Sequence, residues 1–521
     1  MEKLSNSLST NLQAVKEVLP AEDVLTFSFR SADGVDCAIV YADGMVNKGL
    51  LGDLIARPVS SIRLKEDDST STPSEEKEAG QGQMGGKKRQ NAGGRGEVSL
   101  KILRQNLLFP EIKEKTSLQE IVKEVLDGNA LLLADGVQTG LIIGAKFLPV
   151  RTVSEPPADV AVKGPREGFI EDFKTNATLL RKRLKSPALR IDTLRAGKRS
   201  DTVIGLCYLD GICNPDLREA LQKKIEHIDV DILPDSSYVT ALIAPRKHSI
   251  FKSVGTTEKP DVFAAKLAEG RVGVLVDGSP IALTLPYSLN EDFQSGEDYF
   301  VSPFMATIFR LLRVVAVLFS LFLPAFYVST QLFKMQLLPL GLTLTIAKGG
   351  QELPFSPSME TFVVLLIFET LREASIRMPK YVGTSLSIVG ALVLGEAAVS
   401  AGFLSTPTII IVALSGIGLY TAPNFVETGS ILRWLYLIVA GSLGPFGLIL
   451  AAAFTLYYLI SADSFGMPPL APFAPLVKHD LKDGIVKYGM EQLDERPNIY
   501  RPQNKTRLRT RQKGERRDQR L

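Results

Sequence analysis

Residues 117–143 read SLQEIVKEVLDGNALLLADGVQTGLII, and residues 259–285 read KPDVFAAKLAEGRVGVLVDGSPIALTL. Each stretch predicts a short helix that ends in glycine, then an apolar strand, an Asp-Gly turn and a second strand. Glycine suits the end of a helix, and Asp-Gly suits a tight hairpin. The offset from Gly128 to Gly270 equals the offset between the two Asp-Gly turns. We infer an internal duplication that gives two α/β lobes.

The rest of the first 300 residues alternates helical and strand patterns, which is typical of α/β folding. We expect strands at Val24–Phe29, Ala38–Tyr41, Thr202–Leu206 and Tyr238–Ala244, and helices at Phe169–Leu184 and Asp216–Ile225. Asp135 and Asp277 are interpreted as turn residues, because neither has an acid, a base or a nucleophile in view as a catalytic partner. We therefore predict no enzymatic activity.

The composition of the whole chain hides a division into unlike parts. The 521 residues carry a formal net charge of +3 and are 45% hydrophobic, but apolar runs dominate only residues 304–460. The N-terminus lacks the apolar core of a secretory signal, so we expect the first 300 residues to be cytoplasmic. Three cysteines and three histidines, none at ligand spacing, argue against a metal site, and no cofactor is expected.

The predicted fold class is a two-lobed cytoplasmic α/β domain followed by an α-helical membrane domain that crosses the bilayer several times. Residues 65–97 have almost no large apolar side chain and should form a disordered linker. The expected parts are 1–64 and 98–300 in the soluble domain, 301–462 in the transmembrane domain, and 463–521 in a cytoplasmic C-terminal region with a basic tail.

The membrane half contains four clear candidate spans. These are Phe304–Val328, Val382–Ala401, Pro407–Tyr420 with its flanks, and Leu432–Leu459, in which Gly441, Gly444, Pro445 and Gly447 permit a kink. Residues 331–347 and 358–380 are ambiguous, so four or six crossings are possible, and we favour four. An even number leaves both termini in the cytoplasm.

Residues 358–380, SMETFVVLLIFETLREASIRMPK, place charges where the surroundings suit lipid. Ionisable groups at membrane depth are costly and mark functional sites. On a helix, Glu369, Arg372, Glu373 and Arg377 fall opposite an apolar stripe, and Glu373 and Arg377 form an i,i+4 pair. These four residues are pore or gating candidates.

Glu396 is a further pore or gating candidate, and it either is solvated near the membrane surface or faces a polar cavity. Small residues around it favour close helix packing, so Gly383, Gly390 and Gly395 are candidates for contacts between subunits. The basic tail, Arg496–Leu521, is interpreted as a disordered anchor on anionic lipid. A nucleic-acid arm is disfavoured, because no aromatic residue follows Tyr500.

Several blocks of the chain, in order, resemble the GerA family, the A subunits of bacterial spore germination receptors. The blocks in the soluble half are Glu155-Pro156, KGPREGF at 163–169, NATLLRKRL at 176–184, TEKPD at 257–261, GRVGVLVDGSP at 270–280 and Glu297-Asp298-Tyr299. Those in the membrane half are LREA at 371–374, IVGA at 388–391 with Gly395, SFG at 464–466 and Ala471-Pro472. Lys259 stands where the family has arginine, and Glu396 stands where it has Gln or Asp.

The resemblance implies a multi-pass protein of the spore inner membrane that responds to nutrients. It implies partnership with an integral-membrane B subunit and a lipoprotein C subunit, and a ring of A subunits that conducts ions. Arg166 and Glu167 in the KGPREGF block are candidates for a subunit contact or an ion pair within the chain. The alternatives are a non-conducting accessory scaffold, similar to a stage V sporulation AF protein, and a secondary transporter subunit, for which we find no inverted repeat.

Overall fold

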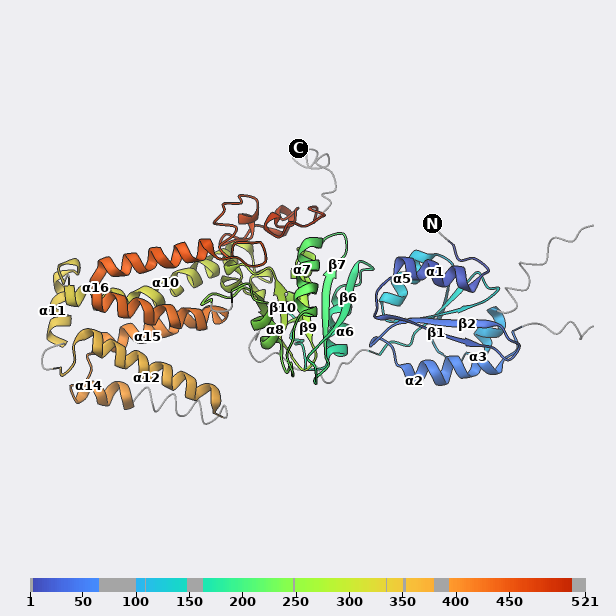
Figure 1. Cartoon of the computed structure of the whole chain (residues 1–521), viewed down its shortest axis with the longest axis horizontal. Coiled ribbons are helices and arrows are strands. Elements are labelled where there is room, and N and C mark those ends of the chain that lie inside the picture. Colours follow the sequence, from blue (N-terminus) through green and yellow to red (C-terminus); the bar gives the residue numbers. More distant parts are fainter. Residues whose placement is uncertain are drawn as a thin grey trace, which may run out of the picture.

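The computed structural model describes residues 3–64, 100–107, 109–147, 163–246, 249–333, 335–349, 353–378 and 393–507. The linker at 65–97, Glu155-Pro156, Gly383, Gly390 and the end of the basic tail lie outside the described residues. Figure 1 shows two α/β lobes in a row, followed by a group of long helices beyond the second lobe. The fold class predicted for the soluble part, α/β with two lobes, is confirmed.

The first lobe is a five-stranded antiparallel sheet between two layers of helix. Its strands, in the order β1-β2-β4-β5-β3, are β1 (Val24–Arg30), β2 (Asp36–Ala42), β3 (Ile112–Lys115), β4 (Ala130–Ala134) and β5 (Gly140–Ile143). Helices α1 (Leu8–Val18) and α5 (Leu118–Leu126) cover one face. Helices α2 (Lys48–Leu51), η1 (Gly52–Ala56) and α3 (Arg57–Ser61) cover the other (Figure 1). Buried side chains alternate along β2 between these two faces, as expected for a strand covered on both sides.

The second lobe repeats the same arrangement. Its strands, in the order β6-β7-β9-β10-β8, are β6 (Leu189–Ala196), β7 (Thr202–Leu209), β8 (Gly255–Thr257), β9 (Val272–Val276) and β10 (Ala282–Leu285). Helices α6 (Phe173–Arg183) and α9 (Pro260–Ala268) cover one face, and α7 (Pro215–Glu226) and α8 (Ser236–Ile243) cover the other. The two sheets therefore share one strand order, with β1 corresponding to β6 and β4 to β9.

The two Asp-Gly turns do the same structural task in the two lobes. Asp135 Oδ1 accepts a hydrogen bond from the Leu8 N–H at the start of α1 (2.9 Å), and Asp277 Oδ1 accepts one from the Phe173 N–H at the start of α6 (3.1 Å). The following glycines, Gly136 and Gly278, both have φ of 83°, a conformation that favours glycine. Turn chemistry, with a helix cap added, accounts for both aspartates.

An ion pair joins the two lobes. Arg181 on α6 is 1% exposed, and its guanidinium donates to both carboxylate oxygens of Asp23, which precedes β1 (2.9 and 2.6 Å). Lys185 binds Asp127 at the end of α5 with a distance of 2.7 Å. A bidentate Arg–Asp pair fixes orientation as well as distance, so these contacts hold the lobes in a defined relation.

The helical region is built around α10 (Pro303–Phe333), α15 (Thr406–Tyr420) and α16 (Val426–Ser461), which pack side by side (Figure 1). The shorter helices are α11 (Leu340–Gly349), α12 (Pro357–Arg377), η5 (Val393–Ala397) and α14 (Ala398–Ser400). Among the described residues, two helical stretches are long and apolar enough to cross a membrane: α10, and Pro423–Ser461, which contains α16. The expected kink in α16 is present, since Gly444 has φ 66° and ψ −156° before Pro445.

The surface of these helices is apolar. Large hydrophobic side chains are exposed along α10, α15 and α16, among them Phe304, Leu312, Ile417, Leu443, Phe446 and Phe454. Such a continuous apolar surface suits contact with lipid. Of the other two predicted spans, Thr406–Tyr420 forms the shorter apolar helix α15, and Val382–Ala401 lies mostly outside the described residues.

Two sequence predictions about local structure are wrong. Tyr238–Ala244 is not a strand but part of α8, because Asp235 caps the Ser237 N–H (2.9 Å) and Val239 and Ile243 bury one helical face. Residues 496–507 are not a free basic tail. They pack against the second lobe, where Arg496 Nε donates to the Ala268 carbonyl (2.7 Å) and Tyr500 is 5% exposed.

Candidate functional site among the membrane helices

The four charged residues predicted on one face of α12 divide into two pairs. Glu369 and Arg372 turn toward the neighbouring helices, with side chains 14% and 24% exposed and 2.9 Å between Glu369 Oε2 and Arg372 Nη2. Glu373 and Arg377 point outward, with side chains 56% and 78% exposed, and form the predicted i,i+4 ion pair at 2.6 Å. Only the second pair is available to water or to another subunit.

A third residue, which the sequence reasoning missed, binds to the inner pair formed by Glu369 and Arg372. Arg433 on α16 is 1% exposed and donates to Glu369 Oε1 and to Ser415 Oγ (3.1 Å). Arg372 in turn donates to Ser430 Oγ on α16 (2.8 Å). The signal was present in the sequence, because Arg433 is the one cation in the apolar stretch Leu432–Leu459. A charge at membrane depth is costly unless it is paired, and Glu369 is the partner of Arg433 here.

Small residues bring α15 close to its neighbours around this cluster. Ser320 and Ser415 each donate a hydroxyl hydrogen bond to the other's backbone carbonyl (2.5 and 2.7 Å), which joins α10 to α15. A Cβ added at Gly418 would lie 2.6 Å from the Ala316 carbonyl oxygen, and one at Gly416 would lie 2.2 Å from the Phe368 ring. Such small-residue contacts are the usual means of helix association in membranes.

A second buried acid lies at the other end of α12. Glu360 is 3% exposed and accepts a hydrogen bond from the Ser405 N–H (2.5 Å) at the N-terminus of α15. The N-terminus of a helix stabilises negative charge, because its first N–H groups lack helical partners. Glu360 thus joins the start of α12 to α15, and Glu369 joins the second half of α12 to α16.

Buried ion pairs tie the helices to the soluble part. Arg310 on α10 binds Asp298 (3.0 Å) and Asp483 (2.9 Å), and Arg313 binds Asp298 (2.7 Å). Arg310 is 1% exposed and faces the protein. Burial alone would raise the pKa of Asp298, but hydrogen bonds from Arg313, the Ser295 N–H and Arg310 hold that pKa below its ordinary value.

The remaining predicted site residues are placed as follows. Glu396, in η5, is exposed, and a Cβ added at Gly395 would meet no atom within 4 Å. Glu167 forms ion pairs with Lys182 (2.5 Å) and Arg183 (2.6 Å) of α6, so it acts within the second lobe. Arg166 is exposed.

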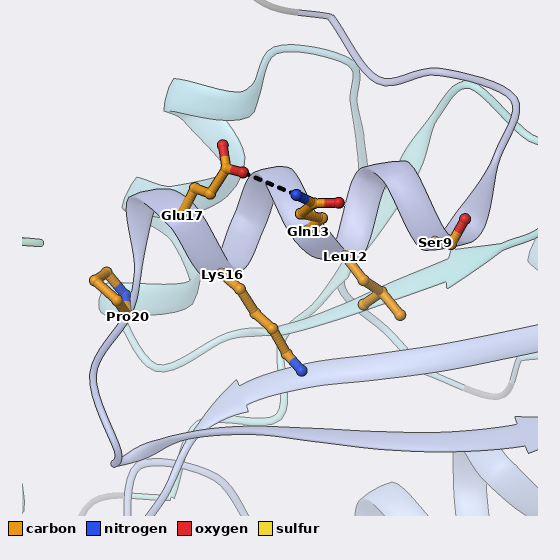
Figure 2. A pocket seen from close by; sticks show the side chains of 6 residues that line it. All are labelled: Ser9, Leu12, Gln13, Lys16, Glu17 and Pro20. Carbon is orange, nitrogen blue, oxygen red and sulfur yellow. Dashed lines mark hydrogen bonds between the residues drawn. The ribbon is translucent and has the colours of Figure 1, made fainter.

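A surface hollow on α1 offers no comparable chemistry. Its six lining residues are exposed or half-buried, and five of them come from α1 (Figure 2). Its amide and carboxylate already hydrogen bond to each other, Gln13 Nε2 to Glu17 Oε1 at 3.1 Å. We assign no site there.

Comparison with known proteins agrees with this architecture. Residues 11–499 match the family described as Bacillus/Clostridium GerA spore germination protein. The chain is 33% identical to spore germination protein KA of Bacillus subtilis over 97% of this chain and 88% of that one. It is 30% identical to spore germination protein B1 of B. subtilis over 97% of this chain and all of that one. It is 34% identical to the uncharacterized membrane protein YfkQ of B. subtilis over 76% of this chain and 78% of that one.

Among solved structures, the N-terminal domain of the A subunit of the Bacillus megaterium spore germinant receptor GerK3 matches 54% of this chain and 96% of its own length. The TM-score is 0.37 and the identity 23%.

The fold and the charged helical cluster define a membrane protein with a two-lobed α/β region. The chain belongs to the GerA family of spore germination proteins. This membership confirms the resemblance seen in the sequence and supports a role in spore germination.

Proposed function

We propose that the protein is the A subunit of a nutrient germinant receptor in the spore inner membrane. It works with a B-type membrane subunit and a C-type lipoprotein, and copies of it assemble around an ion path that opens when a nutrient is sensed. Family membership supports the receptor role, and the ion path rests on one further observation.

That observation is the exposed ion pair of Glu373 and Arg377 on α12. Glu373 and Arg377 are exposed on a helix whose neighbours expose apolar side chains, and Glu396 is exposed in η5. Charges facing lipid hydrocarbon cost several kcal/mol, so they turn instead toward water or toward a partner. A ring of subunits that surrounds water with these faces satisfies that requirement.

The inner charges have a different part in this proposal. Glu369, Arg372 and Arg433 satisfy one another within one chain, so they position α12 rather than line the path. Their loss should disturb gating by letting α12 shift, whereas changes at Glu373 or Arg377 should alter conduction itself.

The C-terminal region supports the proposed topology. Residues 463–507 pack against the second lobe, for example through the Gln503 N–H and the Ile212 carbonyl (2.9 Å). Two segments in contact lie on the same side of the membrane, so the helices between them cross it an even number of times. In this proposal both regions lie in the cytoplasm.

The test is reconstitution of the chain with its B and C subunits in planar bilayers. Nutrient addition should raise the conductance, and Glu373→Gln should change its size or ion selectivity. Intact, well-folded complexes that bind nutrient and yet carry no current would favour the non-conducting scaffold.

A further inference from the structure

A cavity of about 570 Å³ lies where the second lobe meets the membrane helices. Its walls include Lys259 and Asp261 at the start of α9, Arg313 on α10, and the connection from Tyr420 to Asn424 between α15 and α16. The cavity is therefore bounded by soluble and membrane-adjacent parts of the chain at once.

Two opposite charges in this wall lack partners. Lys259 is 4% exposed, and neither its ammonium nor Asp261 Oδ1 has a hydrogen-bond or ion-pair partner in the part of the chain that the structure describes. A buried charge without a partner costs several kcal/mol, so such groups mark places where a partner from outside belongs. Both residues belong to the TEKPD block that the sequence singled out.

Three other charged groups around the cavity have partners within the chain. Lys266 binds Glu291 (2.6 Å), Arg271 binds Glu269 (3.1 Å), and Lys252 Nζ donates to the Asn424 carbonyl (2.7 Å). Within the TEKPD block, Lys259 thus lacks a negative partner and Asp261 lacks a positive one.

The position of Lys259 in the chain also favours a negatively charged group beside its ammonium. Lys259 is the N-cap residue of α9, and no side chain caps the N-terminus of this nine-residue helix. Free N–H groups at a helix start favour an anion, and an adjacent ammonium adds to that preference. Gly296 lies beside this ammonium, since a Cβ there would be 3.9 Å from Lys259 Nζ.

We propose that this cavity binds a small zwitterion, with its carboxylate or phosphate on Lys259 and its ammonium on Asp261. Such chemistry is carried by a free amino compound or by the headgroup of an amine-bearing phospholipid at the membrane surface. A ligand held there contacts the second lobe and the α15–α16 connection together, so it couples the two regions. The site does not depend on ion conduction.

The experiment is calorimetric titration of the full chain in detergent with O-phosphoethanolamine and with L-alanine, alongside inorganic phosphate. Lys259→Gln should weaken zwitterion binding about tenfold or more, the effect of losing one charge-assisted hydrogen bond. Asp261→Asn should weaken zwitterion binding but leave phosphate binding unchanged. The control Lys223→Gln, an exposed residue on α7, should bind like the unaltered chain.

A second experiment distinguishes a lipid headgroup from a free ligand. If a lipid fills the site, the unaltered chain should have a higher Tm in nanodiscs of phosphatidylethanolamine than in nanodiscs of phosphatidylglycerol. Lys259→Gln would remove that difference. A free ligand would give titration heats without a lipid-dependent Tm. Absence of both effects, or binding that survives Lys259→Gln and Asp261→Asn in variants with an unaltered circular dichroism spectrum, would overturn the proposal.

Discussion

Arg310 and Asp298 form an ion pair, 3.0 Å from Nε to Oδ2, in which each side chain is only 1% exposed. Arg310 lies near the start of the first membrane helix, and Asp298 lies in η3 (Gly296–Tyr299), the turn that leads out of the soluble part. The same arginine binds Asp483 from the C-terminal region. Three segments that are distant in sequence are thereby fixed at one point, where the soluble part joins the membrane helices.

Replacing Asp298 tests this junction. Asp298→Asn leaves Arg310 and Arg313 buried beside a neutral group, and breaking a buried pair in this way costs about 3–5 kcal/mol. We expect a clearly lower Tm in detergent. Glu219→Gln, which removes an exposed i,i+4 pair on α7, should leave the Tm unchanged. Equal effects of the two substitutions would contradict the account.

The inner cluster should show strong coupling between Arg433 and Glu369. Glu369→Leu leaves the buried Arg433 without its acid, and Arg433→Met leaves Glu369 with Arg372 as its remaining cation, whereas the double variant removes both charges of the Arg433–Glu369 pair. We expect the double variant to be more stable than the sum of the single effects by about 1–3 kcal/mol. A double-mutant cycle on the free energy of unfolding measures this, and additive effects would show that the pair is not coupled.

Asp292 predicts a pH dependence of stability. Burial, with a smaller contribution from the negative charge of Glu291, raises the pKa of Asp292 to about 6, against a hydrogen bond from Tyr287 and the positive charges of Lys252 and Lys266. Because the folded state holds this proton more tightly than the unfolded state, stability falls as pH rises from about 4 to about 6. The loss is about 3 kcal/mol and is complete above pH 6.

Asp292→Asn should remove this dependence, since the amide keeps the size of the side chain and does not titrate. The measurement is Tm against pH for both chains. The same slope between pH 4 and pH 6 in the variant would assign the dependence to another group.

Truncation tests the C-terminal contact with the second lobe. Tyr500 lies against Arg271, with the guanidinium 4.0 Å from the ring centre, and both side chains are about 5% exposed. Deletion of residues 496–521 exposes Arg271 and should lower the Tm. Deletion of residues 508–521 alone keeps every contact described for this segment and serves as the control. An unchanged Tm after deletion of residues 496–521, or the same loss in both truncated chains, would contradict the structure.

The sequence was sufficient for the lobes, because their pattern is local and occurs twice. The helix, glycine, strand and Asp-Gly turn of residues 117–143 recur at 259–285, and the structure contains this unit in both sheets. What the sequence did not reveal was the strand order that pairs β2 with β4, since these partners are separated by more than 80 residues of chain.

The candidate site was only partly predictable, for a related reason. The i,i+4 pair of Glu373 and Arg377 follows from helical spacing alone, and it is present. The contact between Glu369 and Arg433 joins two helices and depends on how they pack, which spacing within one helix cannot show. The packing of residues 496–507 was missed because their basic composition concealed Tyr500, which is anchored by a tertiary contact with Arg271.

The proposal that the outward charges of α12 line an ion path is tested most directly by single-channel recording of the reconstituted receptor. Glu373→Lys reverses a charge that faces outward in the single chain, so we predict a shift of ion preference toward anions or a clear change in conductance. Lys223→Gln, which changes an exposed residue on α7 in the second lobe, should leave the currents unaltered. Currents of identical size and selectivity in the receptor with Glu373→Lys and in the unaltered receptor would contradict the account.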